Sequence, residues 1–183
     1  MRKKVIVPFA DGFEEIELVG LVDTMRRGGI EVVTCGVSGK SQIGAHGITI
    51  LADMQISETS SDGFDMIVLP GGYKNTMTLA ENDKVQSLIK EFDLKNKYIG
   101  AICAAPIALD RAGVLKDEYT CYPGVSDGIK SSDFIEKAIV ESDNVLTSRG
   151  PGTAICFGLY IIKKLVGEET AEAVKKEMIV ERC

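Results

Sequence analysis

The sequence predicts an α/β fold in which helices cover both faces of a mostly parallel sheet. Two observations lead to this prediction. Apolar runs of strand length recur along the chain with helix-like segments between them. Most of these runs are continuous rather than alternating, which is typical of strands buried on both faces. At 183 residues the chain is long enough for one full core, so we expect a single domain spanning 1–183.

Five main strands are expected, and most of them are short and apolar throughout. They are Val5–Pro8, Glu31–Val37, Met66–Leu69, Tyr98–Ala101 and Val145–Thr147. The pattern changes between Gly36 and Ser57, where further glycines separate short β-type pieces that include Ile48–Leu51. We interpret this segment as an antiparallel excursion attached to the main sheet.

Five helices are expected between and after these strands. They are Glu14–Arg27, Asp83–Phe92, Ala105–Ala112, Thr153–Leu165 and Glu168–Glu177. In the first helix Leu18, Leu21, Val22 and Met25 repeat at the spacing of one helical face. A Gly-Gly pair follows that helix and provides a C-terminal stop. No linker or internal repeat interrupts the pattern, so no domain boundary is expected.

Composition argues against several classes of function. The net charge of −6 gives no basic surface for nucleic acid. No apolar run approaches the ~20 residues that span a bilayer, so we expect no membrane segment and a cytoplasmic protein. The five cysteines lack a Cys-x-x-Cys pair, and a chain of this size does not need disulfides, so a reducing compartment is expected. With His46 as the single histidine, we expect no Cys/His metal site.

The sharpest local motif surrounds Cys103. An apolar strand ends at this potential nucleophile, with the small residues Ala101 and Ala105 two positions before and after it. Pro106 then suits the first turn of a helix. This pattern predicts a nucleophile elbow, and the helix N-terminus behind it would lower the pKa of the thiol. The alternative is a small, inert, buried cysteine at the end of a core strand.

Three further segments follow strands at the same edge of the predicted sheet. The pair Gly71-Gly72 follows a buried strand and offers either backbone N–H groups for an oxyanion or a plain tight turn. The acidic segment 11–17 contains Glu14, Glu15 and Glu17, one of which could be buried and protonated beside a thiolate. Periodicity does not choose among the three. The glycine-bracketed turn in 148–153 resembles a phosphate-binding helix start only loosely, because it lacks the P-loop lysine.

Together these motifs resemble the ThiJ/PfpI superfamily, and within it the DJ-one branch that is linked to Parkinson disease in humans. They occur in the family's order and spacing across nearly the whole chain. The matching stretches are Glu14–Glu17, Val22–Ile30, Ile67–Gly72, Ala101–Pro106 and Leu146–Thr153.

The resemblance implies a flavodoxin-like, three-layer α/β/α sandwich that forms a homodimer. It implies a reactive Cys103, with Glu17 as the protonated acid hydrogen-bonded to its thiolate and Glu14 as a supporting acid. Backbone groups at Gly71, Gly72 and Ala104 would hold an oxyanion. No cofactor and no metal are implied. The activities of the family are glyoxalase and deglycase chemistry on methylglyoxal-like carbonyls, and oxidative sensing or chaperone function through the cysteine.

Two positions depart from the family pattern. Tyr122 stands where the branch often has a histidine near the nucleophile, so Tyr122 is expected to position substrate rather than act as a base. His46 matches a position where some members have an arginine near the dimer interface, and Arg27 is a second candidate for a site-edge or interface role. Ala104 follows the nucleophile where peptidase relatives have a histidine, which argues against proteolysis and amidotransfer.

The leading hypothesis is therefore a cysteine-dependent glyoxalase or deglycase in which Cys103 attacks a small carbonyl compound and Glu17 moves the proton. The rival hypothesis is a redox sensor or chaperone in which Cys103 is oxidised to a sulfinic acid. A third reading is an interaction module with an inert cysteine. The sequence does not separate the first two, because an acid beside a thiolate serves both.

Overall fold

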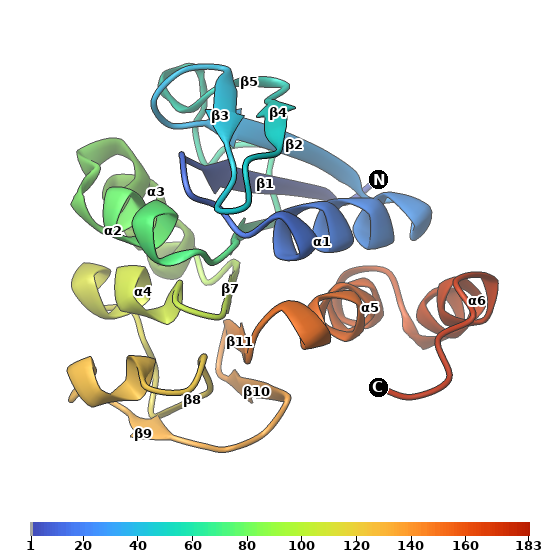
Figure 1. Cartoon of the computed structure of the whole chain (residues 1–183). Coiled ribbons are helices and arrows are strands. Elements are labelled where there is room, and N and C mark those ends of the chain that lie inside the picture. The colour runs from blue at the N-terminus through green and yellow to red at the C-terminus, as the bar shows by residue number, and fades with distance from the viewer. Residues whose placement is uncertain (1) are drawn as a thin grey trace.

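A seven-stranded sheet forms the centre of the protein in the computed structural model, which describes residues 2–183 (Figure 1). Its strand order is β10-β11-β7-β6-β1-β2-β5. Every neighbouring pair is parallel except β10 and β11. The strands are β1 (Lys4–Phe9), β2 (Glu31–Gly36), β5 (Met54–Gln55), β6 (Met66–Leu69), β7 (Tyr98–Ile102), β10 (Ile139–Ser142) and β11 (Val145–Ser148). The predicted mostly parallel sheet is confirmed.

Helices form a layer on each face of this sheet. They are α1 (Glu15–Arg27), α2 (Tyr73–Glu81), α3 (Asp83–Leu94), α4 (Pro106–Ala112), α5 (Ala154–Leu165) and α6 (Glu168–Glu177). Figure 1 shows α1, α5 and α6 grouped apart from α2, α3 and α4. Each group has its own core, and β1 supplies both: Val5 and Val7 belong to the first core and Ile6 to the second. This alternation produces the expected three-layer sandwich.

Segment 36–57 forms a small hairpin outside the main sheet, as its glycine-rich pattern predicted. Its antiparallel strands are β3 (Ser41–Ile43) and β4 (Thr49–Leu51). The chain then returns to the main sheet as β5, which pairs in parallel with β2. A second small ladder, β8 (Glu118–Tyr119) with β9 (Asp133–Phe134), lies beyond α4, and short 3-10 turns occupy Ile56–Glu58, Val125–Gly128 and Pro151–Thr153.

Two cysteines differ from the sequence-based expectation. Cys156 in the first turn of α5 and Cys183 at the end of the described chain form a disulfide. The two cysteines are 27 residues apart, and this spacing does not predict a disulfide. They meet because α6 packs against α5 and the chain after α6 returns to Cys156. Cys35, Cys103 and Cys121 are free thiols.

Across residues 2–183, no helix combines the length and the apolar character that crossing a bilayer requires.

Candidate active site

The candidate site lies where β1, β6, β7 and β11 reach their carboxyl ends. The segments that follow these four strands carry Glu17, Gly71, Cys103 and Gly150 respectively. Parallel strands bring their carboxyl ends to one edge of the sheet, which explains how residues far apart in the sequence meet there.

Cys103 lies on a strained turn between β7 and α4. Its φ of 65° is in the left-handed region, which a residue other than glycine adopts only when its surroundings enforce it. Two backbone hydrogen bonds do so: Cys103 N–H donates to Ser148 O at 3.0 Å, and Tyr122 N–H donates to Cys103 O at 3.0 Å. Ala104 and Ala105 are buried behind the turn. The predicted strained turn between a strand and a helix is therefore present, with Cys103 at its centre, whereas the role of Cys103 as a nucleophile stays a prediction.

Gly71 packs so closely against the cysteine that no side chain fits there. A Cβ at this position would lie 2.5 Å from Cys103 Cβ and 2.5 Å from Glu17 Oε2. The Gly71 N–H donates to Glu17 Oε2 at 2.8 Å. Gly72 has a φ of 89°, and a Cβ there would lie 2.1 Å from Gly12 O. The glycine pair thus permits the acid and the thiol to approach each other, and Gly71 also holds one carboxyl oxygen in place.

Glu17 is the acid that the fold buries beside the thiol. Glu14 caps α1 and accepts the Glu17 N–H at 2.8 Å, which fixes the first helical turn. The Glu17 side chain has no exposed surface, and its Oε1 has no hydrogen-bond partner within residues 2–183. Burial raises the pKa of Glu17 to about 7, against the lowering effects of Cys103 and the Gly71 N–H. The structure thus singles out Glu17 among the three acids that periodicity left open.

The Cys103 thiol does not have the lowered pKa that its place before a helix suggested. Burial, followed by the charge of Glu17, raises the pKa of Cys103 to about 12, although the N–H groups of Gly72 and Ala104 lower it. A buried sulfur beside a carboxylate is costly to ionise, and these effects exceed that of the helix N-terminus. In the resting pair the proton therefore stays on sulfur while Glu17 titrates near neutral pH.

Tyr122 and Gly150 lie near the Glu17 carboxyl oxygen that has no hydrogen-bond partner within residues 2–183. A Cβ built on Gly150 would lie 3.2 Å from Cδ2 of Tyr122 and 4.0 Å from Glu17 Oε1. Tyr122 is half exposed, so part of its ring lies at the protein surface beside Gly150. Gly150 belongs to the glycine-bracketed turn noted in the sequence, but its place at the site was not predicted, because no local pattern shows which strand end faces Glu17.

His46 lies at the edge of the site and binds an acid next to it in sequence. Its Nδ1 lies 2.8 Å from Glu15 Oε2, and its backbone N–H donates to Glu15 Oε1 at 2.6 Å. This contact raises the pKa of His46. Possible ligand atoms of Glu14, Glu15 and His46 lie within 4.8 Å of one another, so the cluster has the spacing of a cation site. Its carboxylates are, however, already used by the Glu17 and His46 N–H groups.

Arg27 is not brought to the site. It ends α1, ten residues after Glu17, which at 1.5 Å per residue is roughly 15 Å along the helix. Its guanidinium pairs instead with Asp23 on the same helix and with Glu177 on α6.

An elbow cysteine, a buried acid and a close glycine turn at the carboxyl edge of a parallel sheet define a class of α/β proteins whose chemistry centres on one thiol. Comparison with known families makes the assignment specific. The chain belongs to the DJ-1/PfpI family, whose model matches residues 3–164.

Several individual relatives align with nearly the whole chain. Protein dj-1beta of Drosophila melanogaster is 35% identical over 98% of both chains, and its crystal structure has a TM-score of 0.96 with full coverage of both chains. A Caenorhabditis elegans relative described as a glutathione-independent glyoxalase is 34% identical over 95% of this chain and 94% of its own. The solved structure of oxidised Toxoplasma gondii DJ-1 has a TM-score of 0.94 at 31% identity, over 98% of this chain and 100% of its own.

Proposed function

We propose that this protein, acting as one ThiJ/PfpI-type domain in the cytoplasm, is a cofactor-free glyoxalase or deglycase with a role in carbonyl stress. Its substrates would be methylglyoxal-like carbonyls or their adducts. The observation that carries the proposal is the buried Glu17 carboxyl, which lies beside the Cys103 thiol, has a pKa of about 7 and has an Oε1 with no hydrogen-bond partner within residues 2–183. The relative described as a glutathione-independent glyoxalase supports the reaction class.

The chemistry begins with addition of the thiol to the aldehyde carbon of methylglyoxal. Ionised Glu17 takes the thiol proton as the Cys103 sulfur bonds to that carbon, so a free thiolate never has to exist in the buried site. Glu17 then gives this proton to the new oxyanion, so the product is a neutral hemithioacetal and Glu17 is ionised again. N–H groups of Gly72 and Ala104, which face the sulfur in the resting site, support the new oxyanion.

The second stage rearranges two protons and then adds water. Glu17 removes the hydrogen of the former aldehyde carbon as a proton and delivers it to the neighbouring carbon, while the hydroxyl proton passes to the neighbouring ketone oxygen. These transfers convert the hemithioacetal into a lactoyl thioester. Water hydrolyses that thioester to lactate and restores the thiol. A carboxyl with a pKa near 7 suits this task because both of its protonation states are populated at neutral pH. Tyr122 would position the substrate from the mouth of the site.

The proposal is tested by following methylglyoxal loss and lactate formation together. The enzymes compared are wild type, Cys103→Ser, Glu17→Gln and Cys35→Ala, the last being a free buried cysteine outside the site. We expect Cys35→Ala to retain activity and the two site variants to lose at least ~10²-fold in kcat/KM. Equal rates in all four proteins would refute the proposal.

Redox sensing with chaperone function is the alternative that a specific observation favours. The similar solved structure of oxidised Toxoplasma gondii DJ-1 shows that a relative of this fold exists in an oxidised form. Here the same N–H groups and the Glu17 carboxyl would stabilise a Cys103 sulfinic acid. Intact-mass spectra after graded peroxide should then show a two-oxygen adduct that Cys103→Ser abolishes, and its absence would count against sensing.

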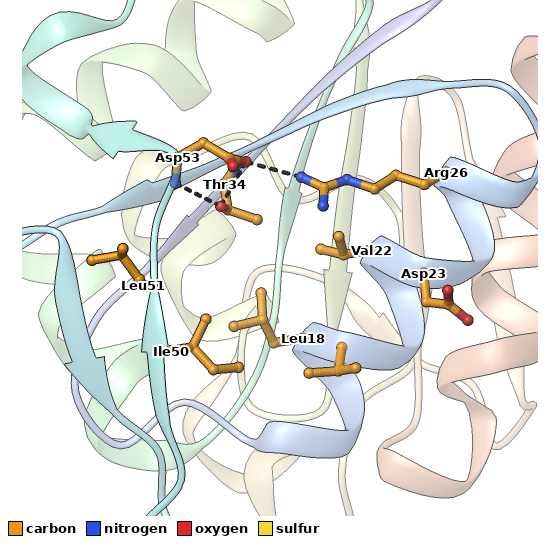
Figure 2. Close-up of a pocket in the computed structure, with 9 residues that line it drawn as sticks. Leu18, Val22, Asp23, Arg26, Thr34, Ile50, Leu51 and Asp53 are labelled. Atoms are coloured by element: carbon orange, nitrogen blue, oxygen red, sulfur yellow. Dashed lines mark hydrogen bonds and ion pairs between the residues drawn. The ribbon is translucent and has the colours of Figure 1, made fainter.

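We further propose that the protein forms a homodimer through α1 and the β3–β4 hairpin. Large apolar side chains are exposed on both elements, among them Ile16, Val19, Ile48 and Leu51. Val19 and Leu51 line a hollow of about 260 Å³. In this hollow Leu18 and Val22 of α1 face Ile50 of β4 (Figure 2).

The proposed dimer is tested through its apolar surface. Val19→Glu should give a monomer by light scattering after size exclusion, whereas Glu172→Gln on the exposed face of α6 should remain a dimer. An unchanged mass for Val19→Glu would exclude this surface as the interface.

A further inference from the structure

The Cys156–Cys183 disulfide lies outside the machinery proposed above. It joins the first turn of α5 to the last residue of the described chain, with a Cα–Cα distance of 5.2 Å. Figure 1 shows the tail leaving α6 and turning back toward α5. None of the residues described at the Cys103 site contacts this disulfide. The Cys103 thiol and the Cys156–Cys183 disulfide are therefore separate groups.

The C-terminal tail, residues 178–183, follows α6, and noncovalent contacts hold its start but not its end. The backbone N–H groups of Met178, Ile179 and Val180 bond to carbonyl groups of α6, and the side chains of Met178 and Val180 pack against the core. Ile179 is exposed and has a φ of 55°, which is strained for a β-branched residue. In residues 181–183 all side chains are exposed, and the disulfide is the main restraint. Opening it would release this segment.

The geometry also favours closure of the bond after it has been opened. Cys156 Sγ lies 3.6 Å from Arg182 O. An oxidised sulfur has no hydrogen to donate, but a Cys156 thiol can donate to that carbonyl. After reduction this contact would become a hydrogen bond, which would keep Cys183 close to its partner without a covalent link.

Small thiols can reach the bond from solvent. Cys183 is exposed and Cys156 is partly exposed. Both line a groove of about 410 Å³ between β10, α5 and α6. Free Cys35 and Cys121, in contrast, are fully buried. Of the cysteines other than Cys103, the pair at 156 and 183 is therefore the one exposed to exchange.

We propose that Cys156 and Cys183 form a second redox site, at which low-molecular-weight thiols reversibly open and close a covalent tie between the C-terminal tail and α5. A thiolate attacks the Cys183 sulfur, the protein S–S bond breaks, and its electron pair leaves on Cys156, which takes up a proton. A second thiolate attacks the mixed disulfide and releases the thiol of Cys183. The net reaction consumes two small thiols and yields one small disulfide and two protein thiols. Closure is the reverse reaction.

The first experiment titrates the native protein with mixtures of reduced and oxidised glutathione. After alkylation and digestion, mass spectrometry measures the peptide in which the two cysteines are linked. We expect the linked fraction to fall from nearly complete to nearly zero across the series, while Cys35 and Cys121 stay protected from alkylation. If the link does not respond to glutathione and opens only after unfolding, the bond is a static cross-link and the proposal is wrong.

The second experiment measures release of the tail with a carboxypeptidase. Reduction should speed removal of the last residues roughly tenfold or more, the change that corresponds to about 1.4 kcal/mol of lost local tethering. Cys183→Ser should be trimmed at the fast rate in every buffer, and this change at an exposed terminal residue leaves the core intact. Cys35→Ala should respond like wild type. Equal trimming of oxidised and reduced wild type would overturn the proposal, as would a disulfide that joins two molecules on a nonreducing gel.

Discussion

The buried acid should make the protein less stable at neutral pH than it would be with an uncharged side chain. The pKa of Glu17 rises from its ordinary value of 4.5 to about 7 in the folded state. Below pH 4.5 the carboxyl is protonated in both the folded and the unfolded chain and has no effect. As the pH rises to 7 the unfolded chain ionises first, so folding becomes less favourable, and above pH 7 the loss is complete. At 1.36 kcal/mol per pH unit, it amounts to about 3 kcal/mol.

Replacing Glu17 with glutamine removes this loss and keeps the shape of the side chain. The amide oxygen can still accept the Gly71 N–H that now bonds to Oε2. We therefore expect Glu17→Gln to gain stability over wild type between about pH 4.5 and about pH 7, up to about 3 kcal/mol, and to hold that gain above pH 7.

The assay is urea unfolding of both proteins across this pH range, with the free energy of unfolding extrapolated to water. Glu172→Gln, on an exposed position of α6, serves as the control and should show no such pH-dependent gain. If the difference between Glu17→Gln and wild type is the same at pH 4.5 and pH 8, burial does not raise the pKa of Glu17, and the proposed acid/base mechanism loses its basis.

Three further predictions concern the same site. Activity on methylglyoxal should rise as the pH passes through about 7, because Glu17 must be ionised to accept the thiol proton; a flat pH profile of kcat/KM would contradict this. Gly71→Ala should cost about 1–3 kcal/mol in thermal or urea unfolding, because its methyl group would overlap Cys103 and Glu17; a stability equal to wild type would mean that the turn adapts freely. Gly150→Ala should leave stability within about 0.5 kcal/mol, since the backbone there is extended, but lower kcat/KM because its methyl group would lie 4.0 Å from Glu17 Oε1; unchanged kinetics would place the substrate elsewhere.

The sequence predicted those parts of the fold that follow from local patterns. Apolar runs of strand length predicted five strands of the sheet, and the helix-like segments between and after them predicted five of the six helices. Helix α2 was missed because two of its four buried side chains, Asn75 and Thr76, are polar. Asn75 holds the helix in place through long-range hydrogen bonds, since it accepts the Ala10 N–H and donates to the carbonyl groups of Pro70 and Gly71. Strand β10 was missed because it is a partly polar edge strand whose pairing with β11 is a tertiary contact.

The sequence predicted less of the candidate site, because the site depends on contacts between segments that are far apart in the chain. Local sterics predicted the turn at Cys103, and the resemblance to a family assigned Glu17, but the roles of both residues remain proposals. No pattern within 148–153 could show that Gly150 faces Glu17, because that contact depends on the order of strands in the sheet. The raised pKa of Cys103 was also unpredictable, since it depends on burial beside Glu17 and not on the helix that follows.

Three features that oppose folding meet at this one place. Cys103 has a strained φ, and Glu17 is a buried carboxyl with one oxygen that lacks a hydrogen-bond partner within residues 2–183. Position 71 must be glycine, because any side chain there would prevent the close approach of Cys103 and Glu17. Each feature alone has a structural explanation, since turns, buried acids and glycines are common. Their coincidence does not, because three losses of stability accumulate in one set of contacts. Sequences retain such conflicts mainly at functional sites, so the coincidence supports the proposal that this pair does chemistry.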